Sequence, residues 1–243
     1  MRFIVMHKTD ARWEAGAVPG RELIARVGQL LGEMAKAKAL LGAEGLRASS
    51  QGVRLRRSGG TLTVRKGPFE GRNELPSGFT ILRVESMDEA VEWASREAKV
   101  LGDVEIDVRP VTEPWDIDLA PRPENAETRR YMALRKATAA SEAGTPLSPD
   151  QRAQLGRLVE DAKRVGVLLA AETLRPSRRG RRYKNSREGV RVTDGPFAES
   201  KELIAGYVML RAESWDDADR WARRYIEAVE AEEVDLRELE DGP

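Results

Sequence analysis

The sequence contains the same segment twice, and this repeat constrains the fold more than any other feature. Shifted by 128 residues, the 243-residue chain aligns with itself without a gap, and about a third of positions 2–111 are identical to their partners. A gapless match of this length indicates a duplicated domain. We therefore predict a first domain at 1–111 and a second at 129–239. The segment between them, 112–128, is rich in proline and acidic residues and is predicted to be a linker.

Each copy shows the element order of an α+β unit. Capping motifs mark two helix starts, Ser148 with Gln151 in the second copy and Ser86 with Glu89 in the first. The expected order is the ferredoxin-like βαββαβ plan with an extra hairpin, in which two helices cover one face of an antiparallel sheet. In the first copy we expect strands at 3–7, 39–47, 78–84 and 106–108, with the hairpin at 52–66.

The sheet face without helices needs a partner. Alternate residues of a strand point to opposite faces, and Thr80, Leu82 and Val84 suit contact with helices. The opposite face carries large apolar residues in both copies, which are not expected to lie in water. We predict that the two bare faces pack together, so that the copies form an intramolecular pseudo-dimer, a dimeric α+β barrel. The residues of this face are Phe79, Ile81 and Arg83 in the first copy and Tyr207, Met209 and Arg211 in the second.

The most specific motif is Asp194-Gly195-Pro196-Phe197, within the run VTDGPFAESKE at 192–202 and followed by Gly206-Tyr207. With this motif the second copy resembles the YCII-related, DGPF-type proteins, and the strands at 168–175 and 234–237 are also similar to that family. The first copy departs from the pattern, because Lys66 replaces the Asp and Asn-Glu-Leu-Pro stands at 73–76.

The resemblance implies a dimeric α+β barrel with a cleft or lumen between the paired sheets. Some YCII relatives resemble small-molecule lyases or dehalogenases with a His–Asp dyad after the first strand, and neither copy has a histidine in the matching loop. Genes of the family often look associated with transcription-factor genes. The resemblance therefore leaves both an enzyme and a regulatory module open.

His7 is the only histidine, and it ends the first strand on the same side as Phe3 and Val5. If Phe3 points between the copies, His7 points there too and is a candidate general base. A structural, hydrogen-bonded histidine is the alternative, and we favour it because no Ser or Asp partner stands at a recognisable spacing. The repeat partner of His7 is Arg135.

Arg83 and Arg211 recur on the apolar face, and with Arg135 they are candidate ligand-binding cations. If each copy has ferredoxin-like strand order, the third strand lies beside the first, and Arg83 approaches His7. Paired arginines could clamp a carboxylate or phosphate. The alternative, which we favour, is a structural ion-pair network with the acidic residues of the last strand.

The Asp194 motif has a structural interpretation as well as a functional one. Asp before Gly-Pro forms turns, glycine allows unusual φ, and proline fixes the next bend. Phe197 would fill a core or lumen, and a purely structural role is favoured for the motif. The alternative makes Asp194 a catalytic acid in a pocket, in at most one copy, because Lys66 stands at the matching place.

Several classes of protein are not expected. Lys+Arg and Asp+Glu both number 41, so we expect no nucleic acid partner despite the basic run at 175–191. No cysteine and one histidine leave no recognised metal site, and no glycine-rich phosphate loop indicates a nucleotide cofactor. The N-terminus does not read as a signal peptide, and no apolar run reaches the ~18 residues that span a bilayer. We expect a cytoplasmic protein without cofactor, metal or membrane partner.

The resulting functional hypothesis is a YCII-related protein that binds a small anionic metabolite between the two sheets. The expected ligand-binding residues are Arg83, Arg135, Arg211, Phe79 and Tyr207, and His7 and Asp194 are the catalytic candidates. Whether the chain is an enzyme is left open. It could be a cofactor-independent lyase or hydrolase, or a non-catalytic regulatory or interaction module associated with transcription control. A homodimer of the full chain is left open as well.

Overall fold

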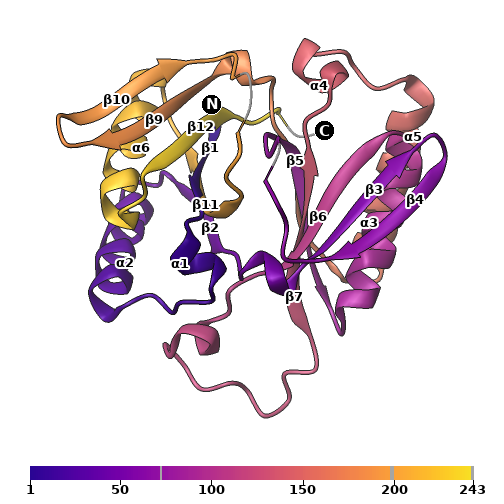
Figure 1. Cartoon of the computed structure of the whole chain (residues 1–243), viewed down its shortest axis with the longest axis horizontal. Coiled ribbons are helices and arrows are strands. Elements are labelled where there is room, and N and C mark those ends of the chain that lie inside the picture. Colours follow the sequence, from indigo (N-terminus) through magenta and orange to yellow (C-terminus); the bar gives the residue numbers. More distant parts are fainter. Residues whose placement is uncertain (72, 198–199, 242–243) are drawn as a thin grey trace.

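Two six-stranded antiparallel sheets form the centre of the molecule (Figure 1). The computed structural model describes residues 1–71, 73–197 and 200–241. The first copy contributes β1 (Arg2–Lys8), α1 (Ala11–Glu14), α2 (Arg21–Lys36), β2 (Leu40–Gly45), β3 (Val53–Ser58), β4 (Thr61–Lys66), β5 (Pro76–Val84), α3 (Met87–Leu101) and β6 (Val104–Pro110). The second contributes β7 (Arg129–Lys136), α4 (Ala139–Ala143), α5 (Pro149–Arg164), β8 (Leu168–Thr173), β9 (Gly180–Ser186), β10 (Gly189–Asp194), β11 (Ile204–Arg211), α6 (Trp215–Val229) and β12 (Glu233–Glu238). Three short 3-10 helices are η1 (Ser49–Gln51), η2 (Pro114–Ile117) and η3 (Ser177–Arg179).

Each sheet is built from both copies. The first sheet has the order β10-β9-β12-β1-β11-β2, and the second has the order β4-β3-β6-β7-β5-β8. The strand–helix–strand start of each copy therefore lies in one sheet, and the remainder of that copy lies in the other. Figure 1 shows this exchange by colour, since indigo β1, α2 and β2 lie with yellow and orange α6, β12 and β9.

The exchange corrects one expectation from the sequence. The third strand of a copy does not lie beside the first strand of the same copy, because β1 pairs with β11 and β5 pairs with β7. Arg83 on β5 and His7 on β1 consequently lie in different sheets. The chain passes from one sheet to the other in the segments after β2 and after β8, where Leu46 bridges to Val111 and Leu174 bridges to Leu239.

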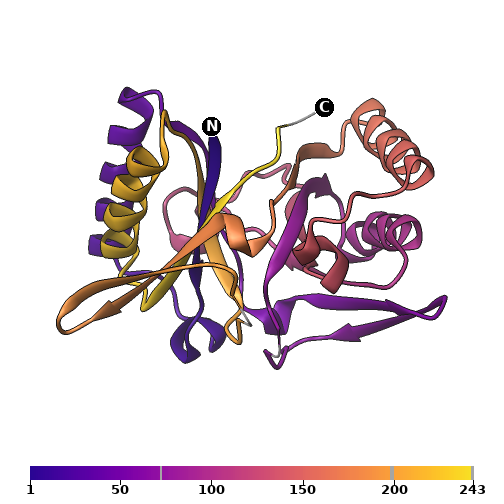
Figure 2. The ribbon, with the colours of Figure 1, turned by 90° about the horizontal axis from the view of Figure 1, so that it is seen from above.

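The ferredoxin-like plan is confirmed when the exchanged strands are taken together. The four strands β12-β1-β11-β2 carry α2 and α6 on one face, and β6-β7-β5-β8 carry α5 and α3. The hairpins β9–β10 and β3–β4 extend the two sheets beyond β12 and β6. Figure 2 shows that the helices lie on the two outer sides and the sheets face each other between them.

The helix starts follow the capping motifs of the sequence. Ser86 accepts a hydrogen bond from the Glu89 amide, and Ser148 accepts one from the Gln151 amide. Such caps satisfy backbone donors that have no partner inside the helix, each worth about 1 kcal/mol. The predicted linker contains η2, which also begins with a capping box, formed by Glu113 and Asp116.

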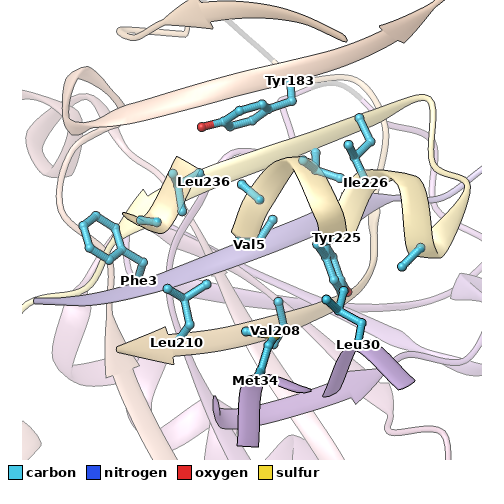
Figure 3. Packing of buried hydrophobic residues seen from close by; sticks show 14 of the residues in the cluster. Phe3, Val5, Leu30, Met34, Tyr183, Val208, Leu210, Tyr225, Ile226 and Leu236 are labelled. Carbon is cyan, nitrogen blue, oxygen red and sulfur yellow. The ribbon is translucent and has the colours of Figure 1, made fainter. Parts of the chain in front are cut away.

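A core of buried side chains lies between each sheet and its helices. In the first sheet, Phe3 and Val5 of β1 and Val208 and Leu210 of β11 point toward the helices (Figure 3). Met34 of α2 covers them from the helix layer. The predicted helix-side face of the third strand is therefore confirmed. Phe3, however, points toward the helices and not into the space between the two sheets.

A second apolar layer fills the space between the sheets. Phe79 and Tyr207, one from each sheet, are buried, and their rings lie 5.2 Å apart. Two ion pairs cross the same space at symmetric places, Arg2 with Glu172 at 2.8 Å and Arg130 with Glu44 at 2.5 Å. The prediction that the two bare faces pack on each other is confirmed. Other members of this layer are Ile4, Met6, Ile81, Met132, Leu134 and Met209.

No helix within the described parts of the chain is long and apolar enough to pass through a lipid bilayer.

The exchange of strands makes a prediction about the isolated copies. Residues 1–111 alone lack β11 and β12, which flank β1 in the full chain. We expect this fragment to be unfolded or to form a homodimer by light scattering, and to assemble one-to-one with residues 129–239 into a species with the circular dichroism of the full chain. A folded monomer of residues 1–111 would contradict the exchange.

Candidate functional site

His7 lies in the helix-side core and not between the sheets. Its Nδ1 is 2.9 Å from the Tyr225 hydroxyl of α6, and the two rings meet edge to face. In the β1–β11 ladder His7 stands opposite Gly206, where a Cβ atom would lie only 2.6 Å from the ring. This glycine of the family motif therefore leaves room for the imidazole. Burial, with a contribution from Lys8, lowers the pKa of His7 to about 4.

Arg135, the counterpart of His7, has a different partner at the same place. It forms an ion pair with Glu97 of α3 at 2.8 Å and donates to the Glu172 carbonyl at 2.9 Å. Glu97 also accepts a hydrogen bond from Thr80. Both side chains are thus engaged within the helix-side layer of the second sheet.

The other predicted ligand-binding residues are separated by the structure. Arg83 and Arg211 are exposed at strand ends, whereas Phe79 and Tyr207 are buried in the apolar layer between the sheets. Arg211 stands opposite Arg2 in the β1–β11 ladder, far along the strand from His7. The structure therefore does not bring the candidates of the sequence together in one pocket.

The two Gly-Pro-Phe turns have the same local structure. The peptide bonds before Pro68 and Pro196 are cis. Phe197 is buried, and its amide donates to the Ser177 hydroxyl, which in turn donates to Glu142. Phe69, Ser49 and Glu14 repeat these contacts in the first copy. Asp194 is outside this arrangement, because its side chain is 80% exposed and pairs with Arg181 at 3.2 Å.

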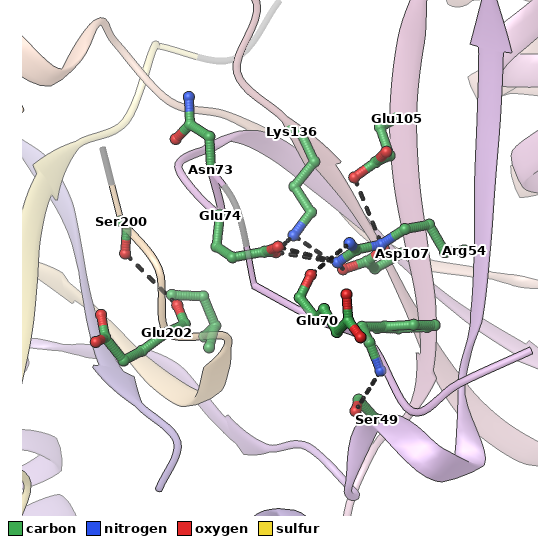
Figure 4. A network of polar contacts seen from close by, with 12 residues as sticks. Ser49, Arg54, Glu70, Asn73, Glu74, Glu105, Asp107, Lys136, Ser200 and Glu202 are labelled. Carbon is green, nitrogen blue, oxygen red and sulfur yellow. Dashed lines mark hydrogen bonds and ion pairs between the residues drawn. The ribbon is translucent and has the colours of Figure 1, made fainter. Parts of the chain in front are cut away.

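A buried cluster of charged side chains lies beside each turn, on the face between the sheets. The Lys136 cluster consists of Arg54, Glu74, Asp107 and Lys136 (Figure 4). Lys136 pairs with Asp107 at 2.9 Å and contacts Glu74, and Arg54 donates to both carboxylates. Phe69 packs against the Arg54 guanidinium, 4.5 Å from ring centre to Cζ.

The Lys8 cluster is the counterpart in the first sheet, and consists of Lys8, Arg182, Glu233 and Asp235. Lys8 pairs with Asp235 at 2.8 Å, and Arg182 donates to the same carboxylate at 2.7 and 3.0 Å. Phe197 packs against Arg182 at 4.4 Å. Each cluster combines a lysine from the first strand of one copy with partners from the other copy.

The carboxylates at the corresponding positions 74 and 202 differ in exposure. Glu74 is buried between Lys136 and Arg54, but its counterpart Glu202 is exposed. The pKa values of the two buried aspartates, Asp107 and Asp235, also shift in opposite directions. Burial raises the pKa of Asp107, and Arg54 offsets this only in part. Burial also acts to raise the pKa of Asp235, but Lys8 and Arg182 outweigh it, so the pKa of Asp235 is lowered.

A second asymmetry concerns the buried arginines of the last strands. Arg109 donates to the carbonyls of Arg47 and Ile204. Arg237 is fully buried and donates to the Arg175 carbonyl, yet its Nε and Nη1 lack hydrogen-bond partners among the described residues. Its distance to Glu142 is 3.7 Å, too long for a direct hydrogen bond.

A pocket of about 550 Å³ opens beside the second Gly-Pro-Phe turn. Phe197 and Pro196 form one wall, and the start of α4 forms another. Asn73 and Leu75 of the first copy complete it, so that both copies contribute. Glu142, which lines the pocket, also lies beside buried Arg237. The remaining lining residues are Ala137, Thr138, Ala139 and Arg178.

Comparison with known families identifies the repeated domain. The family model described as the YCII-related domain matches residues 1–113 and again residues 130–240. The chain belongs to the YCII-related domain family. No curated protein matches it, and no solved structure does. The family assignment therefore rests on the domain model, whose two matches correspond to the tandem duplication.

Sequence reasoning missed the lysines of both clusters, although the repeat contains a signal for them. Lys8 and Lys136 occupy the same place in the two copies and end apolar strands. Lys136 continues the row of Met132 and Leu134, which face the space between the sheets. A cation repeated in such a row requires buried anions nearby. Asp107 and Asp235, on the polar face recognised in the last strands, are those anions.

Within the described residues, no group of three or more His, Asp or Glu side chains is arranged to hold a metal ion. The charged clusters consist of buried ammonium and guanidinium groups paired with carboxylates. Such groups bind anions and hold protons at fixed positions.

The single histidine allows a direct test of its burial. The pKa of His7 lies near 4 in the folded chain and near 6.5 when unfolded, so the unfolded state binds more protons between these values. Stability should therefore fall as pH drops from 6.5 toward 4. In an NMR titration we expect the imidazole resonances to report a neutral ring at pH 5.5. We expect His7→Gln to reduce the pH dependence of the unfolding free energy. A midpoint near 6.5 would contradict the buried, neutral ring.

The two aspartates offer a contrast in stability. Asp235→Ala leaves Lys8 and Arg182 buried without their carboxylate, and should cost roughly 3–5 kcal/mol in unfolding free energy. Asp194→Ala changes an exposed side chain and should stay within about 0.5 kcal/mol. Urea unfolding of both variants measures the difference. Equal losses of unfolding free energy in the two variants would contradict the larger contribution assigned to the buried Asp235.

Proposed function

We propose that the chain binds a small anionic metabolite in the pocket beside the second Gly-Pro-Phe turn. The observation that carries this proposal is the pocket itself, which lies beside the family motif and is lined by residues of both copies. Its volume of about 550 Å³ is within the ~300–1,000 Å³ range of metabolite sites. Phe197 gives the pocket an apolar wall, and Asn73 and Thr138 supply polar groups.

Two charged side chains line the pocket, Glu142 and Arg178. The Glu142 carboxylate accepts hydrogen bonds from Ser177 and lies 3.7 Å from Arg237, so its charge is engaged within the protein. Arg178 lines the pocket from the surface and is exposed, with one nitrogen donating to the Glu142 carbonyl at 2.9 Å. Arg182 lies directly behind Phe197. Guanidinium groups bind carboxylates and phosphates in a bidentate manner, because their donors match the spacing of two oxygens.

This location differs from the expected pocket between the centres of the sheets. Phe79 and Tyr207, proposed from sequence to contact the ligand, pack against each other there. The charged and hollowed region lies instead beside the turns that follow the two hairpins. A ligand in this region would contact both copies, as the sequence hypothesis requires, but through loops rather than through the central strands.

The reaction stays a separate question. Neither His7 nor Asp194 lines this pocket, so a lyase or hydrolase mechanism through these residues has no support in the geometry. The non-catalytic regulatory or interaction module also stays a prediction. Binding of an anion is common to both alternatives, and it is therefore the function that we propose.

A charge reversal at the pocket rim tests the proposal. Arg178→Glu should weaken binding of anionic metabolites by about tenfold or more, because a repulsive charge replaces an attractive one beside the ligand. Thermal-shift screening of a panel of carboxylates and phosphates, followed by calorimetry on the hits, measures this. Arg187→Glu, the same change at the exposed tip between β9 and β10, is the matched control. Equal affinities of both variants for every hit would refute the pocket assignment.

A further inference from the structure

We infer that the two β-hairpins bind the phosphate backbone of a double-stranded nucleic acid. The surface with this role is the hairpin face, defined by four exposed cations, Arg56 and Arg65 on the β3–β4 hairpin and Lys184 and Arg191 on the β9–β10 hairpin. None of these residues lines the pocket beside the second Gly-Pro-Phe turn. The inference is therefore independent of the proposed metabolite.

The charges of the chain are balanced in total but are unevenly distributed. The hairpin segments 53–66 and 180–194 contain ten of the 41 Lys and Arg residues, but only two of the 41 Asp and Glu residues. The rest of the chain consequently has eight more acidic than basic residues. The expectation of no nucleic acid partner rests on the balanced total, which does not describe the local charge of the hairpins.

The cations of the hairpin face differ from those of the helix surfaces in their pairing. Arg96 of α3 pairs with Asp161 of α5, and Arg224 of α6 contacts Glu33 of α2. Within the described parts of the chain, none of the four cations of the hairpin face forms an ion pair. Exposed ammonium and guanidinium groups without a protein carboxylate are available to phosphate oxygens.

The strand register places the four cations on corresponding faces of their sheets. Lys184 and Arg191 stand opposite each other in the β9–β10 ladder. Arg56 and Arg65 share the face of Arg54, because Arg65 stands opposite Arg54 and Arg56 follows it by two residues. The alternate residues of both hairpins pack in the helix-side cores. The hairpin face is therefore the side directed away from the helices.

The arrangement of the two hairpins fits a duplex. Lys184 is the counterpart of Arg56 in the repeat, so a cation recurs at the same place in both copies. Figure 2 shows that the hairpins extend on the same side of the molecule and diverge from each other. The backbones of a duplex are also related by twofold symmetry, and symmetric proteins place equivalent elements on both sides of such an axis.

Acidic residues near the hairpin face limit the strength of the expected binding. Glu105 and Glu233, on the neighbouring strands β6 and β12, pair with Arg54 at 3.4 Å and with Arg182 at 3.2 Å. Their charges are thus engaged with the buried clusters. Exposed acidic residues also lie at or beside the hairpin tips, and these are Asp103, Glu188 and Glu232. We therefore expect weak binding that depends strongly on salt.

The hairpins lack the aromatic rings that single strands require. Tyr183, the one aromatic residue of the two segments, is buried. Phe69 and Phe197, which follow the hairpins, are buried against Arg54 and Arg182. Proteins that bind single strands stack the bases on exposed aromatic rings. The hairpin face can contact phosphates without reading bases, which favours a duplex bound without sequence specificity.

The salt dependence of duplex binding by the full chain tests the inference. Four phosphate contacts give a slope of about −3.6 for log affinity against log salt, so affinity should fall about a hundredfold between about 50 and 200 mM salt. Fluorescence anisotropy of a labelled DNA duplex of roughly 20 base pairs measures this slope. Arg65→Gln and Arg191→Gln should each reduce its magnitude by about one.

Charge reversal with a matched control locates the binding surface. Arg56→Glu combined with Lys184→Glu should weaken duplex binding about tenfold or more. Arg96→Glu combined with Arg224→Glu reverses the same number of charges at equivalent places on α3 and α6, and should change affinity by less than about twofold. The neutral glutamine variants keep the test valid if the reversed variant fails to fold.

Four outcomes would overturn the inference. The first is no duplex binding at about 50 mM salt with protein at about 100 µM. The second is equal weakening of binding by the two reversed pairs, and the third is tighter binding of a single strand of the same length. The fourth is binding of polyglutamate with the affinity and salt slope of the duplex, which would assign the hairpin face to an acidic protein partner.

Discussion

The ladders between β1 and β11 and between β5 and β7 are the interactions on which the rest of the structure depends. Each joins the first strand of one copy to the third strand of the other. The central strands β1 and β5 therefore take their backbone hydrogen-bond partners from the other copy. The two copies are thus parts of one cooperative structure, although the sequence repeats as two units.

The same ladders decide the composition of every site. Lys8 reaches Asp235 because β1 lies between β11 and β12, and Lys136 reaches Asp107 because β7 lies between β5 and β6. The charged residues therefore act as contacts between copies, and the ligand site that we propose is composite for the same reason.

Local features of the fold could be predicted from sequence because they depend on neighbouring residues. The capping serines, the hairpins and the two faces of β5 and β11 follow from short spacings and from strand alternation. The exchange of strands could not be predicted in this way. Both copies offer nearly the same edges to β1, and the choice between them is made by the path of the segments after β2 and β8.

The direction of His7 shows the limit of strand parity. Parity places His7 with Phe3 and Val5, which is correct, but it does not say which face meets the helices. The expectation that this row points between the copies followed from Phe3, an aromatic residue that suits either core. Lys8, the next residue in the chain, lies on the opposite face. Only the strand pairing shows that the buried carboxylate of Asp235 lies there to pair with it.

The divergence of the two copies follows contacts and not single positions. His7 meets Tyr225 beside Val208, and at the symmetric place Arg135 meets Glu97, which also binds Thr80. One place holds a neutral hydrogen-bonded pair and the other an ion pair, and each set is internally matched. Since each set combines both copies, a symmetric homodimer of one copy would have two identical sets. Fusion into one chain permits the two sets to differ. The charged clusters differ between the copies as well, since Glu74 is buried and its counterpart Glu202 is exposed.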